Sequence, residues 1–148
     1  PPQIVNHYGY LVKKLEKRTR TFLALGYRME QEIVYDAFRK VNICFLVKDG
    51  CRIELVSPAA EDSVVSGLMK KYKNSPYHIC YQTEDFDAAF AELTAGGFIA
   101  IDTPTPAPAL GGSDVVILTN ADIGMIELIR CAFPAALRPT ILTFFVSL

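Results

Sequence analysis

The stretch IVNHYGYLV, Ile4–Val12, and the stretch SPYHICY, Ser75–Tyr81, contain the only two histidines of the chain. A shift of 71 residues takes His7 to His78. The same shift aligns further positions: Tyr10 with Tyr81, Leu15 with Phe86, Phe22 with Leu93, Gly26 with Gly97 and Tyr27 with Phe98. Because self-similarity at a fixed period indicates a repeated structural unit, we predict two copies of one unit.

The first copy reads as a strand, a helix and three further strands. After Ile4–Val12, an apolar stripe predicts a helix from about Lys14 to Leu25, with Leu15, Phe22 and Leu25 facing inward. Gly26 follows, at the position of a helix C-cap glycine. The remaining predicted strands are YRMEQEIVY at 27–35, KVNICFLV at 40–47 and CRIELVS at 51–57, the last two joined by a Lys48-Asp49-Gly50 hairpin turn.

The second copy follows the same order. Its predicted elements are the strand YHICYQT at 77–83, a helix over Asp85–Ala95, and strands at 98–102, 114–119 and 125–130. The segment PTPAPALGG at 104–112 is predicted to be a loop because of its prolines and glycines. The sequence RIELV at Arg52–Val56 matches MIELI at Met125–Ile129 after a two-residue slip, which a longer loop in the second copy explains.

The predicted fold class is therefore α+β, with two βαβββ modules. The first module spans residues 1–58, a linker with a short helix spans 59–74, and the second module spans 75–131. An apolar C-terminal tail at 132–148 has no counterpart after the first module. We expect the tail to pack on the domain or on a second subunit, or to extend from it loosely ordered.

Composition excludes several classes of function. With 51% apolar and 21% charged residues in 148, the chain is expected to fold around a hydrophobic core. A net charge of −1 gives no electrostatic reason to expect nucleic acid or an anionic membrane as partner. The four cysteines form no CxxC or metal-knuckle spacing, the opening residues do not resemble a signal peptide, and no apolar stretch is long enough to span a membrane. We therefore expect a cytoplasmic protein with reduced cysteines.

Two carboxylates recur beside the two histidines. Since strand side chains alternate between faces, Glu54 lies opposite Ile53 and Leu55, and Glu127 is placed identically in the second copy. If the modules curl around a shared cleft, both glutamates and both histidines converge on it. Carboxylates in a partly dry cleft need a compensating positive charge, and one divalent metal, Zn, Fe, Co, Ni or Mn, suits this ligand set. An isolated strand histidine or glutamate is usually an ordinary residue, but the repetition of both pairs favours a shared metal site.

At these residues the sequence resembles the vicinal oxygen chelate superfamily, which includes glyoxalases, bleomycin-resistance proteins and extradiol dioxygenases. The resemblance runs from about Ile4 to Arg130 and is strongest to the methylmalonyl-CoA epimerase branch. It implies two βαβββ modules forming a curved, cup-shaped mixed sheet around one divalent metal. It also implies four metal ligands, His7, Glu54, His78 and Glu127.

The resemblance also narrows the expected activity. Extradiol dioxygenases have no ligand at the position of Glu54, and drug-binding members generally have no metal ligands, so the complete set favours epimerases and glyoxalase I. Both stabilise an enolate formed by loss of a proton next to a metal-bound carbonyl or thioester. We therefore expect a metal-dependent epimerase, isomerase or lyase that acts on a small molecule such as an acyl-CoA or other thioester, with Glu127 and Glu54 as catalytic carboxylates.

The sequence departs from the epimerases at one position. These enzymes carry a further glutamate base before the third strand, and Phe38 stands at the aligned position here. Asp36 is close enough in sequence to substitute for it. Arg39 and Asn42 could bind a carboxylate or phosphate of the substrate, or lie on a solvated strand edge. Tyr10 and Tyr81 are interpreted as packing residues rather than acids.

Other interpretations remain open at this point. A small-molecule binding or resistance protein of the same fold would use the same cup without turnover, and a glyoxalase I-type lactoylglutathione lyase would return the proton to the adjacent carbon. An accessory domain of a biosynthetic complex would use the apolar tail for association. Both a monomer and a homodimer are compatible with the sequence.

Overall fold

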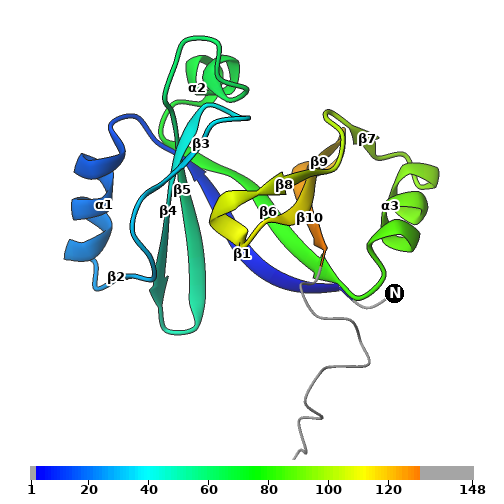
Figure 1. Ribbon diagram of the computed structural model, residues 1–148, viewed down its shortest axis with the longest axis horizontal. Helices are drawn as coiled ribbons and strands as arrows, with labels where there is room; N and C mark the ends of the chain where they lie inside the picture. The colour runs from blue at the N-terminus through cyan, green and yellow to red at the C-terminus, as the bar shows by residue number, and fades with distance from the viewer. Residues whose placement is uncertain (1–2, 131–148) are drawn as a thin grey trace, which may run out of the picture.

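The computed structural model describes residues 3–130, which form a twisted ten-stranded mixed sheet with three α-helices (Figure 1). The strands of the first half are β1 (Gln3–Leu11), β2 (Arg28–Met29), β3 (Val34–Asp36), β4 (Val41–Lys48) and β5 (Cys51–Pro58). Those of the second half are β6 (Ser75–Thr83), β7 (Ile99–Ala100), β8 (Thr105–Ala107), β9 (Ser113–Asn120) and β10 (Gly124–Arg130). The helices are α1 (Leu15–Ala24), α2 (Ser66–Tyr72) and α3 (Phe86–Ala95), with a short 3-10 turn η1 at Pro108–Leu110.

The strand order shows the duplication directly. It runs β2-β4-β5-β1-β6-β10-β9-β7, with β3 paired to β4 and β8 paired to β9, so each half is the mirror of the other in order. The halves join through the antiparallel pair β1 and β6, and each of these strands also pairs in parallel with the last strand of its own half. The predicted α+β class with paired βαβββ units is confirmed, and the sheet stays open.

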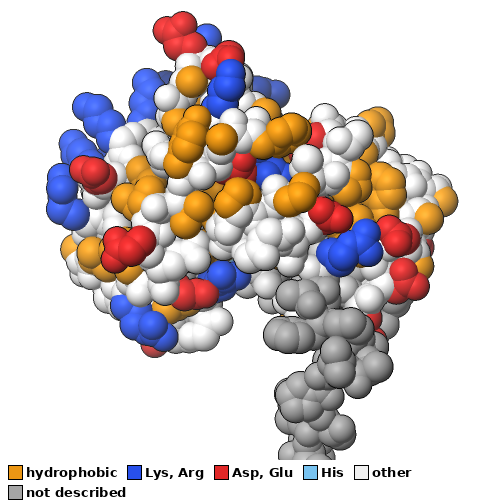
Figure 2. Space-filling view, viewed as in Figure 1, with side chains coloured by type: hydrophobic (Ala, Val, Ile, Leu, Met, Phe, Trp, Pro, Cys, Tyr) orange, Lys and Arg blue, Asp and Glu red, His pale blue; other side chains and the backbone are white. Residues whose placement is uncertain are grey.

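Helices α1 and α3 cover the outer faces of the two halves (Figure 1). Leu15 of α1 packs with Leu46 and Leu55 of the sheet, and Phe22 joins this cluster at its edge. Phe86 and Ala89 of α3 pack in the same way on Val116 and Leu128. Because α1 faces the core with one side only, Lys17 and Arg20 stay exposed while Arg18 is half-buried, and Figure 2 shows basic side chains gathered over this end of the molecule.

The inner faces of the two halves of the sheet face each other. On the first half Val41, Ile43, Phe45 and Val56 form an apolar wall, which α2 closes with Met69. On the second half Ala107 and Val115 pack with Cys80 and Ile129. The predicted linker helix is thus present, and it covers one end of the space between the halves.

Turn residues behave as the sequence predicts. Asp49 and Gly50 both have positive φ, at 51° and 75°, which suits the two central positions of a tight hairpin turn between β4 and β5. Gly26 has a φ of 97° directly after α1, as expected for a glycine that ends a helix.

Three details of the prediction are wrong. Leu25 does not face inward: it is the C-cap of α1 and is 62% exposed. The predicted strand at 27–35 is split into β2 and β3, because the polar segment between them leaves the sheet while both pieces pair with β4. The predicted loop at 104–112 contains β8, and Pro106 is tolerated there because β8 is an edge strand that pairs only with β9.

The predicted strand at 98–102 is shortened to β7 for a different reason. The side chain of Asp102, rather than backbone, accepts the hydrogen bond from the Ile117 amide, at 2.9 Å between N and Oδ1. The tail at 132–148 lies outside the described residues. None of the helices within residues 3–130 has the length and apolar character needed to cross a bilayer.

Candidate metal centre

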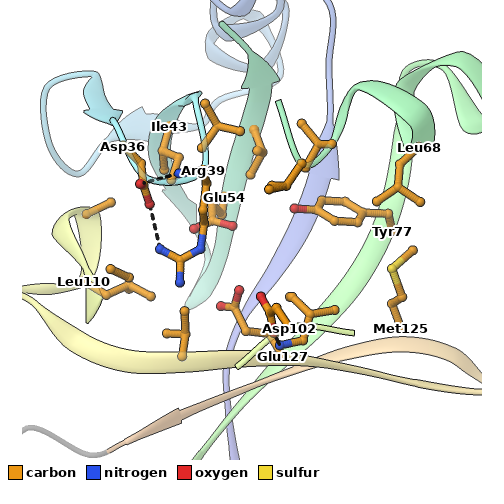
Figure 3. Close-up of a pocket in the computed structure, with 18 of the residues that line it drawn as sticks. Asp36, Arg39, Ile43, Glu54, Leu68, Tyr77, Asp102, Leu110, Met125 and Glu127 are labelled. Atoms are coloured by element: carbon orange, nitrogen blue, oxygen red, sulfur yellow. Dashed lines mark hydrogen bonds and ion pairs between the residues drawn. The ribbon is translucent and has the colours of Figure 1, made fainter. Parts of the chain in front are cut away.

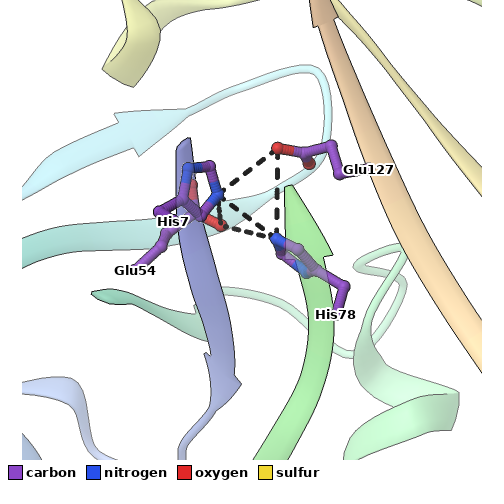
Figure 4. Close-up of side chains that lie close together, drawn as sticks. All are labelled: His7, Glu54, His78 and Glu127. Carbon is purple, nitrogen blue, oxygen red and sulfur yellow. Dashed lines mark hydrogen bonds and ion pairs between the residues drawn. The ribbon is translucent and has the colours of Figure 1, made fainter. Parts of the chain in front are cut away.

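His7 and His78 come from the two strands that join the halves. β1 and β6 run antiparallel, with His7 opposite Cys80 and Gly9 opposite His78, and the register is irregular on both sides of this segment. The two imidazoles therefore lie side by side on the β1–β6 pair, with their Nε2 atoms 3.3 Å apart (Figure 4). Both rings are nearly inaccessible to solvent, at 1% and 4% exposure.

Glu54 and Glu127 reach the two imidazoles from β5 and β10, the strands that flank the β1–β6 pair. Glu54 of β5 pairs with Gly9 of β1, and Glu127 of β10 pairs with Cys80 of β6. Oε1 of Glu54 lies 3.7 Å from Nε2 of each histidine. Oε1 of Glu127 lies 3.5 Å from Nε2 of His7 and 4.0 Å from Nε2 of His78. The structure thus brings together all four predicted ligand side chains, with one ligand atom of each within 4.8 Å of the others.

These separations suit a single divalent ion. Two donors bonded to one ion at about 2.1 Å lie about 3.0 Å apart at a right angle and about 3.4 Å apart at a tetrahedral angle. The nitrogen–oxygen distances of 3.5 to 4.0 Å need only small shifts to reach this range. Oε1 of Glu127 is buried without a hydrogen-bond partner, a state that is costly unless a cation binds there.

Asn6 holds the ring of His7 in the form that a metal requires. Its Oδ1 lies 2.7 Å from Nδ1 of His7 and also accepts a hydrogen bond from Arg52 at 2.8 Å. Because this oxygen accepts in both contacts, Nδ1 of His7 is the donor, and Nε2 points toward the carboxylates. Asn6 was not predicted from the sequence, since the aligned position in the second copy is Tyr77.

Burial and the two carboxylates act against each other on the pKa values of the cluster. Burial lowers the pKa of His7, but Glu54 and Glu127 outweigh it and raise the pKa to about 9. Burial lowers the pKa of His78. Burial raises the pKa of Glu127, yet the two histidines overcome it and lower the pKa to about 2. In the metal-free protein at neutral pH, a proton on His7 therefore supplies the positive charge that the carboxylates need.

Gly9 makes room for the ring of His78. A Cβ atom built at Gly9 would lie 2.1 Å from Cε1 and 2.3 Å from Nδ1 of His78, far inside van der Waals contact. No side chain larger than hydrogen therefore fits at position 9 while His78 keeps its place. This requirement could not be predicted from the sequence, because the contact crosses between strands.

A cavity of about 850 Å3, open to solvent at its mouth, lies beside the cluster (Figure 3). Glu54 and Glu127 form part of its wall, and most other lining residues are aliphatic. The further polar side chains that line it are Asp36, Arg39, Tyr77 and Asp102. Burial raises the pKa of Tyr77 well above its usual value, so its hydroxyl stays protonated. Neither Tyr77 nor Asp102 was among the residues predicted from the sequence.

Arg39 and Asp36 form a bridge across the cavity. Nη1 of Arg39 contacts Oδ2 of Asp36 at 2.8 Å, and the Arg39 backbone amide donates to Oδ1 at 3.0 Å. The guanidinium also donates to the carbonyls of Pro106 and Thr105, at 3.0 and 3.2 Å. Arg39 thus ties the first half to β8 of the second, and it is not a solvated strand-edge residue.

Asn42 does not line the cavity. On β4 it alternates with Val41 and Ile43, which face inward, so its side chain lies on the opposite face of the sheet. There it borders a shallow depression with Lys14, Lys17 and Arg20 of the α1 end. The suggested contact between Asn42 and a substrate in the cup is therefore not supported. Tyr10 and Tyr81 pack against the α1 and α3 clusters, as interpreted from the sequence.

We predict that Gly9→Ala weakens metal binding by about 10- to 100-fold, because the new methyl group displaces the His78 ring. Titration of the metal-free protein with zinc or cobalt measures this. Gly67→Ala is the matched control, since a Cβ at Gly67 meets nothing within 4 Å. Equal affinities for the two variants would contradict the geometry of the site.

We also predict that metal uptake releases a proton. Below pH 9 the free protein carries a proton on His7 that a bound metal must displace, so affinity should rise with pH up to about 9. His78 and Glu127 add no proton at neutral pH, because their pKa values are lowered. Calorimetry at pH 7 in buffers with different ionisation heats should show release of about one proton per ion. Proton release that is absent at pH 7, or that is as large at pH 10 as at pH 7, would contradict the assignment of this proton to His7.

Curated proteins similar to this chain are acyl-CoA epimerases. An ethylmalonyl-CoA/methylmalonyl-CoA epimerase of Cereibacter sphaeroides is 30% identical over 83 residues, which cover 55% of this chain and 62% of the relative. The human mitochondrial methylmalonyl-CoA epimerase is 27% identical over 90 residues, 60% of this chain and 51% of the relative. The chain thus spans between half and two thirds of the length of these curated relatives.

A solved structure with the same fold is the Streptomyces coelicolor methylmalonyl-CoA epimerase in complex with 2-nitronate-propionyl-CoA. It has a TM-score of 0.74 at 22% identity and covers 87% of this chain and 97% of its own. The model of the glyoxalase/bleomycin resistance protein/dioxygenase superfamily matches residues 6–116. The chain belongs to this superfamily.

Proposed function

We propose that the protein is a metal-dependent epimerase that moves the proton next to the carbonyl of a small acyl thioester, with malonyl-type acyl-CoA esters as the substrate class. The observation that carries the proposal is the buried His2Glu2 cluster at the wall of a largely aliphatic cavity. The epimerases among the relatives support the same chemistry.

His7, Glu54, His78 and Glu127 would hold the metal, which when bound would stabilise negative charge on the thioester oxygen. Zn, Co, Ni, Mn and Fe all suit this donor set. Replacing a neutral imidazole or an ionised carboxylate would remove a ligand, so we expect each of the four residues to be needed for tight binding.

The chain itself would supply the base and the dry surroundings. Glu127 is ionised at neutral pH and lines the cavity from the second half, so it is one candidate for the base. Glu54 faces the same cavity from the other half and is the second candidate. The aliphatic walls exclude water from the reacting carbon, which strengthens the electrostatic interactions around it.

A substrate of this class would lie partly inside the cavity and partly outside it. The acyl group fits the aliphatic space, whereas the long polar part of a coenzyme thioester would leave through the mouth. Arg39 lies in the wall with its charge held by Asp36 and two carbonyls, so it would serve as a fixed hydrogen-bond donor on one side of the acyl group. This assignment keeps the predicted role of Arg39 and gives Asp36 the task of positioning it.

We predict that the metal-loaded protein exchanges the α-proton of methylmalonyl- or ethylmalonyl-CoA with deuterated solvent, and that a chelator abolishes the exchange. Glu54→Gln should lower the rate by about 10²- to 10⁴-fold, because the amide cannot take up a proton. Mass spectrometry of the recovered thioester measures the exchange. Glu61→Gln, at an exposed loop position, serves as control and should exchange at the wild-type rate.

The same experiment separates the alternative functions. A binding or resistance protein would retain the ligand after metal removal and exchange no proton. A glyoxalase I-type lyase would instead turn over a glutathione hemithioacetal. Either result, together with no exchange on acyl-CoA esters, would contradict the proposed epimerase.

A further inference from the structure

Inversion at carbon needs two proton-transferring groups. One removes the proton from one face of the carbon, and another delivers a proton to the opposite face. If the proposed epimerase function holds, a second proton-transferring group must therefore lie beside the metal-binding carboxylates. Phe38 stands where the resemblance to the epimerases implies a further glutamate; it is 66% exposed and has no proton to transfer.

Asp36 is not free to take this role. Both of its oxygens are engaged by Arg39, and its side chain is buried at 1% exposure. Protonation of Asp36 would break the ion pair that holds Arg39 against Pro106 and Thr105. Asp36 thus acts on the cavity through Arg39 and not by proton transfer.

Asp102 is the remaining carboxyl group among the described residues that line the cavity. Its Oδ1 is fixed by the Ile117 amide at 2.9 Å, which leaves Oδ2 without a hydrogen bond to another described residue. Ile117 lies directly opposite Glu127 in the register of β9 and β10. Asp102 is therefore held on the wall of the second half, whereas Glu54 projects from β5 of the first half (Figure 3).

Two properties of Asp102 suit an acid that returns a proton. Burial raises the pKa of its carboxyl group, and the charge of Glu127 adds to this, although the Ile117 amide and Arg39 act in the other direction. The residue lines the cavity and is exposed to solvent, so it can exchange protons with water between turnovers. Tyr77 shares the cavity but remains protonated, and so it cannot remove a proton in the reverse direction.

We propose that Asp102 is the second acid–base residue of the epimerase and that it works on the face of the substrate opposite Glu54. In one direction the glutamate carboxylate takes the α-proton, the C–H bond breaks and its electrons pass into the enolate. The protonated Asp102 then gives its proton to the other face of the same carbon, and a new C–H bond forms. Asp102 is left as a carboxylate and the glutamate as an acid, and exchange with water restores both. In the reverse reaction the two residues exchange roles.

The test is a comparison of inversion with exchange in Asp102→Asn, using each isolated enantiomer of the acyl-CoA ester in deuterated water. The asparagine keeps an oxygen for the Ile117 amide, so the wall should be preserved. We expect inversion to fall by about 100-fold or more. One enantiomer should still exchange its α-proton with retention of configuration at a rate within a few-fold of wild type, with unchanged metal content.

Asp122→Asn is the matched control, because Asp122 is an exposed carboxylate in the turn before β10 and loses the same charge. It should invert at the wild-type rate, and Asp102→Glu should recover part of the activity. Inversion by Asp102→Asn at the wild-type rate would overturn the proposal, as would equal loss of exchange from both enantiomers with the metal retained. A wild-type protein that exchanges neither enantiomer would instead overturn the proposed epimerase, and the role of Asp102 with it.

Discussion

Two carboxylates buried against two imidazoles are the feature on which the site depends. Glu54 and Glu127 approach the same pair of histidines within 4.0 Å while nearly excluded from water. Like charges held so close in a poorly solvated place repel each other strongly, and they persist only if a positive charge lies between them. Without a metal, a proton on His7 meets this need, and a divalent ion would meet it more fully.

The duplicated fold brings the two histidines and the two glutamates together. Each half contributes one histidine and one glutamate from adjacent parallel strands, and the antiparallel pair β1 and β6 places the two sets side by side. Neither half contains enough ligands to bind an ion tightly alone. Gly9 allows the two strands to carry His7 and His78 within 3.3 Å, and the Arg39 bridge to β8 ties the two walls of the cavity. Metal binding should therefore be coupled to the packing of one half against the other.

Much of the fold and of the candidate site could be predicted because the sequence repeats. The 71-residue repeat identified the modules and all four clustered side chains, and strand alternation placed Glu54 opposite Ile53 and Leu55. The same alternation, applied to β4, would have placed Asn42 away from the cup, but this requires knowing which face of β4 lies inward. Leu25 extended an apolar stripe past the end of α1, where the helical period no longer determines direction.

Other features depend on contacts between distant segments that no local pattern records. The Arg39 guanidinium recognises backbone carbonyls, which every residue possesses, and Gly9 faces a ring 69 residues away in the sequence. Asp102 interrupts a predicted strand, and only its bond to Ile117 shows why. These residues determine the shape and chemistry of the cavity, so the fold is easier to infer from the sequence than the reaction.

The most direct test of the account is X-ray absorption spectroscopy, with elemental analysis, of the protein saturated with zinc or cobalt. We expect about one ion per chain whose first shell contains two imidazole nitrogens and carboxylate oxygens at about 2.0–2.2 Å. A protein that takes up no stoichiometric metal, or an ion whose shell lacks the imidazoles, would show that the four side chains do not form one binding site.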